Sequence, residues 1–597
     1  MNRYRKAPAI ALATLGALAC YQTPARADDT ADEIRALKAQ LKKLEEKVDA
    51  QARKQKETQV QIRAVESRPV PAPTAVSYPA GIGVGPLGGA PQTGLTAAES
   101  AVRGLPVAGA PSLFINGVSI TPGGFLALEG VFRNHFLPAD IGSVYQSIPY
   151  YNSRVGYADE FRLSARQSRF SLLAKGDVDP VTHLAGYIEG DFLGAAQTAN
   201  SNESNSYQPR IRHVYATFDQ DDWGAHVLAG QTWSLITMDT KGIIPRQEDV
   251  PLTIDAQYVP GFAWARQPQL RFVKDFGKSF WAGISVENPQ TTAGCAPASG
   301  VFLNPCFPAG TPQYAGYFPT VGTAATYGAS PLYNSPAIGG SLFNTANSYS
   351  FNHVPDVAGK VAWDSSFDGH DIHVEGFGLF REFTDQTVNN PYFSGAVTNN
   401  NVAGGSGGGS ILVSVLPKML EVQFSGMTGR GVGRYGSGQL PDVAINWNGT
   451  LSPIQETMLL AGVIAHPTPQ LDLYAYAGQE DQQASEATII TPPGHFAAYG
   501  YGNPLYTNAG CSIISSAACV GNTHLIRQIT GGLWDNLYSG PFGKVRVGLQ
   551  YSFTQRFSFA GIGGVAKTEQ SAGLFSIRYY PFDAPPPPPP APVVAKY

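Results

Sequence analysis

The sequence lacks any long apolar run that would form a transmembrane helix. Although 43% of its 597 residues are hydrophobic, no stretch beyond the amino terminus reaches the ~18 consecutive apolar residues that such a helix needs. Charge is also scarce: 14% of residues are charged, the net charge is -4, and no long basic block is present. These absences exclude a helical membrane protein and argue against nucleic acid as a partner.

Catalytic and metal-binding motifs are lacking as well. There is no GxSxG nucleophile elbow, no HExxH and no P-loop, and GVGRYG (431–436) matches GxGxxG only by count, because it opens no helix. His370 and His373 straddle an expected turn without a third ligand nearby, so we predict no metal site and no cofactor. An enzyme is therefore not expected, and an outer-membrane lipase-like barrel is the weaker alternative.

Cysteine is rare, with five in the chain. Cys20 lies in the amino-terminal apolar stretch, where Ala17 three residues before it disfavours a lipidation site. The other four form two local pairs, Cys295 with Cys306 and Cys511 with Cys519, in Gly/Pro/Ser/Asn-rich regions. Neither pair has the CxxC spacing of a zinc site, so we predict two disulfide-closed loops formed in an oxidising compartment.

The amino terminus has the pattern of an export signal. Arg3, Arg5 and Lys6 precede an apolar stretch over 7–19, and Ala25-Arg26-Ala27 provides the small residues that flank a cleavage point. We predict a signal peptide over 1–27. An exported chain without a membrane helix is periplasmic, secreted or an outer-membrane barrel.

Residues 28–66 are predicted to form a coiled coil. Apolar residues recur at alternating steps of three and four between charged flanks, at Ile34, Leu37, Leu41, Leu44 and Val48. A self-associating coiled coil of two or three strands fits this pattern, and an amphipathic helix packed on its own chain is the alternative. Residues 67–112 are rich in Pro, Ala and Gly and predict a flexible linker.

From about Gly123 onward, apolar and polar residues alternate repeatedly, which predicts strands. An even number of strands, about sixteen, is typical of a single-chain outer-membrane barrel, here an all-β antiparallel barrel over 113–582. The expected strands lie near 123–134, 163–175, 183–193, 209–218, 224–234, 261–274, 279–288, 356–366, 371–382, 409–416, 419–428, 456–465, 470–480, 524–534, 543–557 and 571–582.

The connections support a membrane barrel over a soluble sandwich. Short turns such as KGDVDPV and KDFGKS alternate with long polar segments at 135–162, 235–260, 289–355, 383–408, 429–455 and 481–523. Periplasmic turns and outer loops of membrane barrels differ in length in this way. In KVRVGLQYSFTQRFSF (544–559), the valine face is therefore expected to meet lipid and the arginine face water. GGSGGGS (404–410) is expected within a loop.

The last strand resembles the aromatic assembly signal of outer-membrane proteins, since it ends at Tyr580-Pro581-Phe582. A proline-rich tail over 583–597 follows it and predicts a polyproline segment, either a periplasmic spacer or a docking motif.

Alternation also predicts which charged residues line the pore. A set of inward-facing arginines from distant strands would attract small anions. They are Arg133, Arg169, Arg212, Arg271, Arg381, Arg546 and Arg578. Pro268 predicts a bulge that shifts the register near Arg271. The alternative is that each arginine pairs with a neighbouring carboxylate and makes the wall rigid.

The segment 235–260 is predicted to be the constriction loop. Its charged residues would set an acidic edge against the basic wall; they are Asp239, Lys241, Arg246, Glu248, Asp249 and Asp255. The alternative is an ordinary surface loop.

Several short motifs resemble the DcaP-like trimeric porins of Gram-negative outer membranes. They are ARQSRFSLLAKGD (165–177), QPRIRHVYATF (208–218), AGQTWS (229–234) and ARQPQLRF (265–272). The resemblance implies a trimeric sixteen-stranded barrel with a periplasmic coiled coil and passive uptake of small anionic solutes, dicarboxylates among them. It also implies that Arg169, Arg212 and Arg271 line the lumen. The proline-rich tail and the long cysteine-bearing loops depart from the family pattern.

The functional hypothesis is an anion-selective porin in the outer membrane of a Gram-negative bacterium. Its expected partners are two further copies of the chain, outer-membrane lipid and lipopolysaccharide, and small anionic solutes. The alternatives are a phosphate-selective or general diffusion porin, and an anchor that contacts peptidoglycan through the coiled coil or the proline-rich tail.

Overall fold

The structure is a computed structural model. It describes Lys42 and residues 112–137, 139–194, 208–294, 334–336, 348–388, 397–491 and 495–583. The predicted signal peptide, linker and proline-rich tail lie outside the described residues, apart from Ser112 and Asp583 at their ends. The same holds for the coiled coil except Lys42, and for Cys295 and Cys306. No helix among the described residues is long and apolar enough to cross a membrane.

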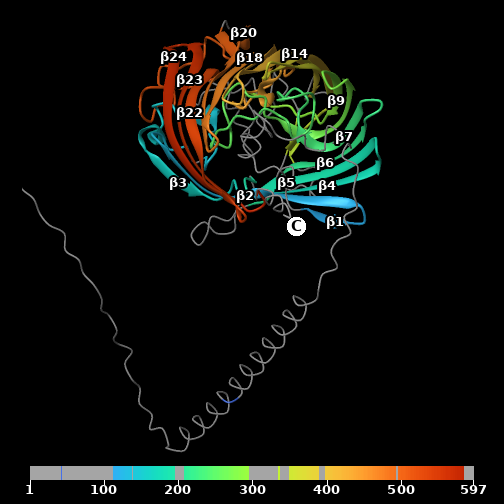
Figure 1. Ribbon diagram of the computed structural model, residues 1–597. Coiled ribbons are helices and arrows are strands. Elements are labelled where there is room, and N and C mark those ends of the chain that lie inside the picture. Colours follow the sequence, from blue (N-terminus) through green and yellow to red (C-terminus); the bar gives the residue numbers. More distant parts are fainter. Residues whose placement is uncertain are drawn as a thin grey trace, which may run out of the picture. The chain divides into compact units, whose positions relative to one another are not determined.

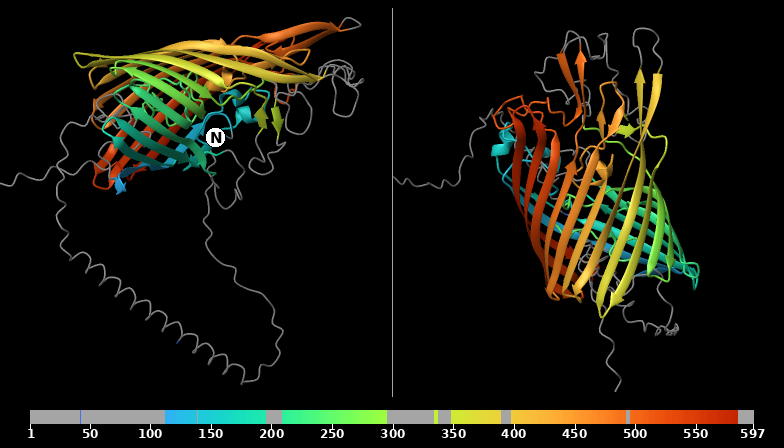
Figure 2. Two further views of the ribbon diagram at one scale, coloured as in Figure 1. Left: turned by 90° about the vertical axis from the view of Figure 1, so that its right-hand side faces the viewer. Right: turned by 90° about the horizontal axis from the view of Figure 1, so that it is seen from above.

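The described chain forms a closed antiparallel β-barrel of sixteen strands (Figures 1 and 2). The main sheet has eighteen strands. Two of them, β3 and β4, follow each other in one wall position, and β1 (Leu113–Ile115) pairs only with the start of β2. The wall strands are β2 (Val118–Arg133), β3 (Glu160–Ser164), β4 (Arg169–Asp179), β5 (Thr182–Asp191), β6 (Arg210–Gln220), β7 (Ala225–Trp233), β8 (Arg266–Phe276), β9 (Phe280–Glu287), β12 (Asp356–Phe367), β13 (His370–Val388), β14 (Val397–Leu416), β15 (Leu420–Arg430), β18 (Gln455–Thr468), β19 (Leu471–Gln482), β22 (Thr523–Gly540), β23 (Gly543–Gly561) and β24 (Gly564–Tyr580).

Pairing of the first and last wall strands closes the barrel. The second half of β2 pairs with β24 from Leu126↔Tyr579 to Arg133↔Ala572, and its first half pairs with β4. β1 (Leu113–Ile115) precedes β2, and three small hairpins lie in the loops: β10 (Asn334–Pro336) with β11 (Ser348–Ser350), β16 (Val443–Ile445) with β17 (Leu451–Pro453), and β20 (Ser485–Thr491) with β21 (His495–Tyr501). Each strand predicted from the sequence overlaps one of these wall strands.

The apolar face of the strands is the outer face of the barrel. On β23, Leu549 and Tyr551 are each 57% exposed, whereas Arg546 is fully buried and Ser552 nearly so. Large exposed aromatic side chains gather at the ends of strands next to the short turns, at Trp223, Phe276, Phe367 and Phe542. An apolar outer band with an aromatic girdle is the surface that membrane barrels present to lipid.

The two rims differ in the length of their connections. Short turns join β12 to β13, β8 to β9 and β22 to β23 on one rim. In the first of these, Asp368 and Gly369 both have positive φ (49° and 79°), as a type I′ turn requires. The opposite rim carries the connections over 134–159, 234–265 and 483–522. This segregation, expected from the sequence, identifies the short-turn rim as periplasmic.

The predicted loop over 383–408 is largely strand. β13 and β14 pair continuously from Ile372↔Val413 to Val388↔Val397, and GGSGGGS lies within β14. The glycines are needed there because a Cβ at Gly408 would lie 2.5 Å from the Phe377 ring and one at Gly405 2.2 Å from the carbonyl of Leu379. Glycine usually marks loops, but here it permits close approach within a long hairpin.

The bulge predicted at Pro268 is also absent. β8 pairs with β7 in regular register through Pro268↔Gln231. A register shift instead occurs where β5 pairs with β6, between Glu189↔His213 and Gly190↔Ile211. Arg212 is the extra residue of this bulge, and such a bulge redirects a side chain locally.

Candidate pore and constriction

The connection between β7 and β8, residues 234–265, folds into the barrel. Most of its side chains are buried, including Leu235, Ile236, Leu252 and Ile254 at 0–1% exposure. A surface loop would leave many side chains in water. The segment predicted as a constriction loop therefore lies inside the lumen.

Apolar contacts hold the loop against much of the inner wall. One part packs on β18, β19 and β22, where Leu252 and Ile254 join a cluster with Tyr476 and Trp534. The indole of Trp534 donates to the carbonyl of Leu252 (2.8 Å). The start of the loop packs on β9 and β12 through a second cluster that includes Ile243 and Trp281.

A buried lysine fastens the loop to β12. Nζ of Lys360 donates to the carbonyl of Thr237 (2.7 Å) and to Oδ2 of Asp239 (2.8 Å), and it also pairs with Glu375 on β13. Lys360 is 3% exposed. Because a buried charge must be paired, this network fixes the position of Asp239 strongly.

Buried carboxylates fix the other parts of the loop. Asp255 accepts bonds from the backbone N–H (3.0 Å) and the hydroxyl (2.6 Å) of Ser143. Oε1 of Glu480 accepts from the backbone N–H groups of Gly261 (2.7 Å) and Gly438 (2.8 Å). The loop is thus held by several wall strands and by the two outer connections that contain Ser143 and Gly438.

Four arginines gather on the β4–β8 side of the lumen around two carboxylates. Glu189 on β5 contacts Arg212 at 2.5 Å and Arg169 at 3.6 Å. Asp191 contacts Arg212 at 3.2 Å and Arg210 at 2.7 Å. The Arg210 side chain remains 30% exposed, so this group is open to water at one edge.

The fourth arginine, Arg266 on β8, stacks on Trp233 with its guanidinium carbon 4.6 Å from the ring centre. We name Arg169, Arg210, Arg212 and Arg266 the arginine cluster. With Glu189 and Asp191 counted, four positive charges face two negative ones, an excess of two.

A loop tyrosine responds to this positive charge. The hydroxyl of Tyr258 lies 3.5 Å from Nη2 of Arg212. Burial alone would raise the pKa of Tyr258, but the charges of Arg212, Arg169 and Arg266 outweigh it and lower that pKa to about 8. The electrostatic environment at this side of the loop is therefore strongly positive.

The remaining predicted arginines lie in paired networks. Arg578 pairs with Glu129 (2.7 Å), Arg133 with Glu160 (3.4 Å) and Arg546 with Asp472. Arg381 bridges Asp356 (3.1 Å) and Asp442 (2.8 Å). Each of these arginines is at most 3% exposed.

Arg271 has a different environment from the other predicted arginines. It donates to the carbonyl of Trp233 (2.7 Å) and to Oε1 of Gln269 (3.0 Å), and it is 3% exposed. It therefore supports the residue on which Arg266 stacks.

The charged residues predicted for the constriction loop are spread along it. Asp239, Glu248, Asp249 and Asp255 are buried, and Lys241 is exposed. Arg246 lies with its guanidinium carbon 5.5 Å from the centre of the Tyr187 ring. The buried acids Asp239 and Asp255 anchor the loop.

Sequence reasoning missed Arg210, Arg266 and Lys360. Arg210 stands two residues from Arg212, so alternation contained the signal for it. Alternation along β8 assigns Arg266 to the outer face, because Pro268 and Leu270, two and four residues later, are exposed. Its stacking on Trp233 in the structure brings it to the lumen, which alternation could not predict. Alternation along β12 places Lys360 on the inner face, and nothing else in the sequence indicates its role.

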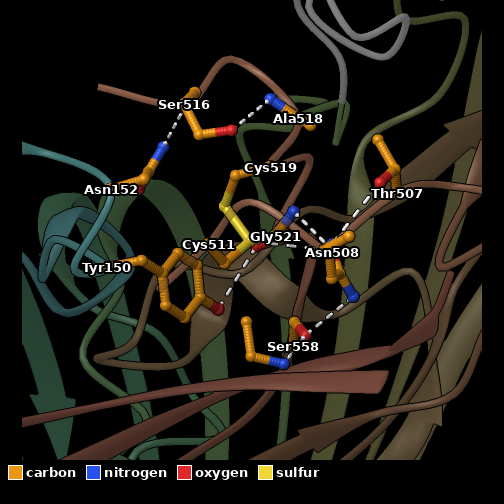
Figure 3. The surroundings of a disulfide bond; sticks show 12 residues. Tyr150, Asn152, Thr507, Asn508, Cys511, Ser516, Ala518, Cys519, Gly521 and Ser558 are labelled. Atoms are coloured by element: carbon orange, nitrogen blue, oxygen red, sulfur yellow. Dashed lines mark hydrogen bonds between the residues drawn. A yellow bond between two sulfur atoms is a disulfide. The ribbon is translucent and has the colours of Figure 1, made fainter. Parts of the chain in front are cut away.

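One predicted disulfide is present in the connection between β21 and β22 (Figure 3). Cys511 and Cys519 are joined, which confirms that pair. Asn508 connects the closed loop to β23: its Oδ1 accepts from the N–H of Gly521 (3.1 Å) and its Nδ2 donates to Ser558 (3.2 Å). Tyr150 lies beside the bridge. The guanidinium carbon of Arg556 lies 4.5 Å from the centre of the Tyr150 ring.

No protein-family model matches the sequence. No curated protein matches it either. Among solved structures, the chain is similar to the outer membrane channel DcaP of Acinetobacter baumannii, with 15% identity over 79% of this chain and 100% of that chain and a TM-score of 0.52. The chain has the fold of an outer-membrane porin.

Two further similar structures have lower TM-scores. The anion-selective porin from Comamonas acidovorans shares 12% identity over 78% of this chain and 99% of that one (TM-score 0.40). OmpF of Salmonella typhi shares 9% identity over 79% and 100% (TM-score 0.37). The closed barrel with its apolar outer band and aromatic girdle is the architecture of outer-membrane proteins of Gram-negative bacteria, the localisation that the sequence predicted.

Proposed function

We propose that the chain forms a water-filled channel through which small anionic solutes, dicarboxylates among them, diffuse passively. The arginine cluster and the loop over 234–265 form the constriction. The pore does no covalent chemistry, and selectivity comes from electrostatic attraction at the narrowest region.

The observation that carries this proposal is the charge excess of the arginine cluster. Its four arginines outnumber Glu189 and Asp191 by two charges, and the charges of three of these arginines lower the pKa of Tyr258. A low-dielectric lumen concentrates such a field and raises the local concentration of anions. Cations meet the opposite barrier.

The donor geometry favours carboxylates. A guanidinium presents paired N–H donors that match the two oxygens of a carboxylate. A dicarboxylate carries two such groups, so neighbouring arginines at Arg210 and Arg266 would hold one solute transiently while it passes. Phosphate has similar oxygens, and a phosphate-selective pore is the second candidate.

The proposal also covers the oligomeric state and the segments on either side of the barrel. We infer a homotrimer, as in the family that the sequence resembles, with the heptads over 28–66 forming a periplasmic coiled coil after removal of residues 1–27. The linker over 67–112 would join it to the barrel, 113–582. The coiled coil or the proline-rich tail over 583–597 would contact peptidoglycan as a secondary role.

Planar-bilayer conductance tests the channel. We expect stepwise openings and, under a KCl gradient, a reversal potential that shows anion preference. Added succinate should block the current more strongly than phosphate at equal charge. The double variant Arg212→Ala, Arg266→Ala should lose most of both effects.

Cation preference in the unmodified protein would overturn the role of the arginine cluster and leave the barrel standing. Stronger block by phosphate than by succinate would favour the second candidate. A folded, heat-modifiable barrel that conducts no current would favour the cell-wall anchor.

A further inference from the structure

The outer wall of the barrel carries a groove that the pore does not use. It has a volume of about 370 Å³ and extends across β15, β18, β19, β22 and β23. Small side chains make its floor and larger apolar ones its sides: Ala461 and Ala477, and Phe424, Leu459, Ile529 and Phe553. Phe424 and Ile529 are 47% and 67% exposed, so the groove opens toward lipid.

The end of the groove nearer the long loops is polar. Gln479, Arg527 and Gln555 lie side by side on β19, β22 and β23. Nε of Arg527 donates to Oε1 of Gln555 (2.7 Å), and its guanidinium carbon lies 5.1 Å from the Phe557 ring centre. Lys567 on β24 approaches the same ring from 5.7 Å.

Arg527 differs from the arginines of the lumen. It is exposed, and within the part of the chain that the structure describes no carboxylate lies at ion-pair distance from it. Two acids lie near it on the outer face, and both have other partners. Glu569 on β24 binds Lys567 and accepts from Gln555 (2.7 Å), and Asp481 on β19 lies 3.7 Å from His524. An exposed guanidinium on the lipid side of a barrel therefore remains available to an anion from the membrane.

The position of Arg527 matches the outer edge of the apolar band. Ten residues separate it from Leu537 near the periplasmic end of β22. At ~3.3 Å per residue and a tilt of about 40°, this distance spans roughly 25 Å of membrane, the height of the apolar band of such barrels. The groove thus lies at the depth of acyl chains in the outer leaflet, with Arg527 at headgroup depth.

We propose that this groove binds the lipid A part of lipopolysaccharide. An acyl chain lies over Ala461 and Ala477, and Arg527 holds a phosphate of the headgroup with its Nη groups. Arginine suits phosphate because its planar donors match two oxygens. The outer leaflet of this membrane supplies a lipid that combines phosphates with acyl chains. Among the described residues, no acid that would attract a basic protein surface lines the groove.

Native mass spectrometry of the full-length protein in detergent tests the site. Bisphosphorylated lipid A is the probe, compared with dephosphorylated lipid A, phosphatidylglycerol and inorganic phosphate. We expect one tightly bound bisphosphorylated lipid A per chain. Arg527→Ala removes the phosphate contact and Ala477→Trp fills the groove, so each should weaken binding about tenfold, as loss of a hydrogen bond to a charged group would.

Matched controls sit away from the groove. Arg162→Ala removes an exposed arginine of β3, whose side chain is 43% exposed, and Ala216→Trp adds an indole on β6. Both should bind lipid A normally. Heat-modifiable migration on a gel verifies that all four variants fold.

Three results would overturn the proposal. One is equal binding of dephosphorylated lipid A or phosphatidylglycerol. A second is lipid A binding unchanged in both groove variants. A third is a lower oligomeric mass for Ala477→Trp with lipid A binding intact, which would assign the groove to a neighbouring copy of the chain.

Discussion

Two sides of the same barrel use arginine in opposite ways. On the β4–β8 side, Arg169, Arg210, Arg212 and Arg266 face Glu189 and Asp191, and part of the cluster remains exposed to water. Toward β22–β24 and β2, Arg133, Arg546 and Arg578 each pair with a carboxylate and are buried. Residue type alone does not distinguish an arginine of the cluster from an arginine in a one-to-one pair; the number of carboxylates that it shares does.

The energetic consequences differ accordingly. A buried one-to-one pair contributes little net stability, but removal of one partner leaves an uncompensated charge at high cost. Within the cluster, Arg266 has no ion-pair partner among the described residues and is repelled by Arg210 and Arg212, so its removal relieves repulsion while it lowers the positive field. Mutation should therefore affect stability on one side and selectivity on the other.

The largest expected effect is on stability. Arg578→Ala would leave Glu129, which is fully buried, without its ion-pair partner (2.7 Å). We expect a loss of about 3–5 kcal/mol in the free energy of unfolding, measured by urea titration of the protein in lipid vesicles. Arg162→Ala removes a half-exposed partner of Glu160, which keeps its second partner Arg133, and should cost at most about 1 kcal/mol. Equal losses for the two variants would contradict the comparison.

Removing the anchor of the loop should change conductance. Lys360→Met keeps the length of the side chain but removes the charge that binds Asp239 and the carbonyl of Thr237. Loss of this buried partner, worth about 3–5 kcal/mol, should release the start of the loop, so single-channel recordings should show larger and noisier currents. Lys241→Met, at an exposed position of the same loop, is the control. Identical recordings from the two variants would show that Lys360 does not hold the constriction.

A single substitution in the cluster should shift selectivity without destabilising the barrel. Arg266→Ala removes a positive charge that has no ion-pair partner among the described residues and stacks on Trp233. A unit charge about 4 Å from a solute in bulk water contributes ~1 kcal/mol, so the anion-to-cation permeability ratio should fall about fivefold. Arg546→Ala, on the paired side, should leave the ratio near its original value in any protein that remains folded. A larger shift from Arg546→Ala would reverse the assignment of the two sides.

The sequence predicted the wall of the barrel better than its interior. Alternation of side chains is a local property, so strands such as β23 and β24 could be recognised from residues like Leu549 and Arg546 alone. It failed in β14, where a run of glycines looks like a linker but serves close packing against Phe377 and Leu379.

The pairing of charges is not a local property. Arg578 and Glu129 are 449 residues apart, and Lys360 and Asp239 are 121 apart. Alternation places each of Arg578, Glu129 and Lys360 on the inner face, but only closure of the barrel and entry of the loop determine which charges meet. The candidate site therefore required the three-dimensional structure even though most of its residues were predicted.

The smallest expected effect is a pH dependence of selectivity. Tyr258, with a pKa of about 8, loses its proton as the pH rises through that value, and the phenolate reduces the excess charge around the cluster from two to one. Anion preference should therefore be greatest below pH 8 and fall by roughly a factor of two above it, since the charge is partly screened by salt. Reversal potentials measured from pH 6 to 9.5 test this, with Tyr258→Phe as the matched variant. If the phenylalanine variant shows the same step, another group carries the titration, and the field of the arginine cluster is weaker than the contacts with Tyr258 indicate.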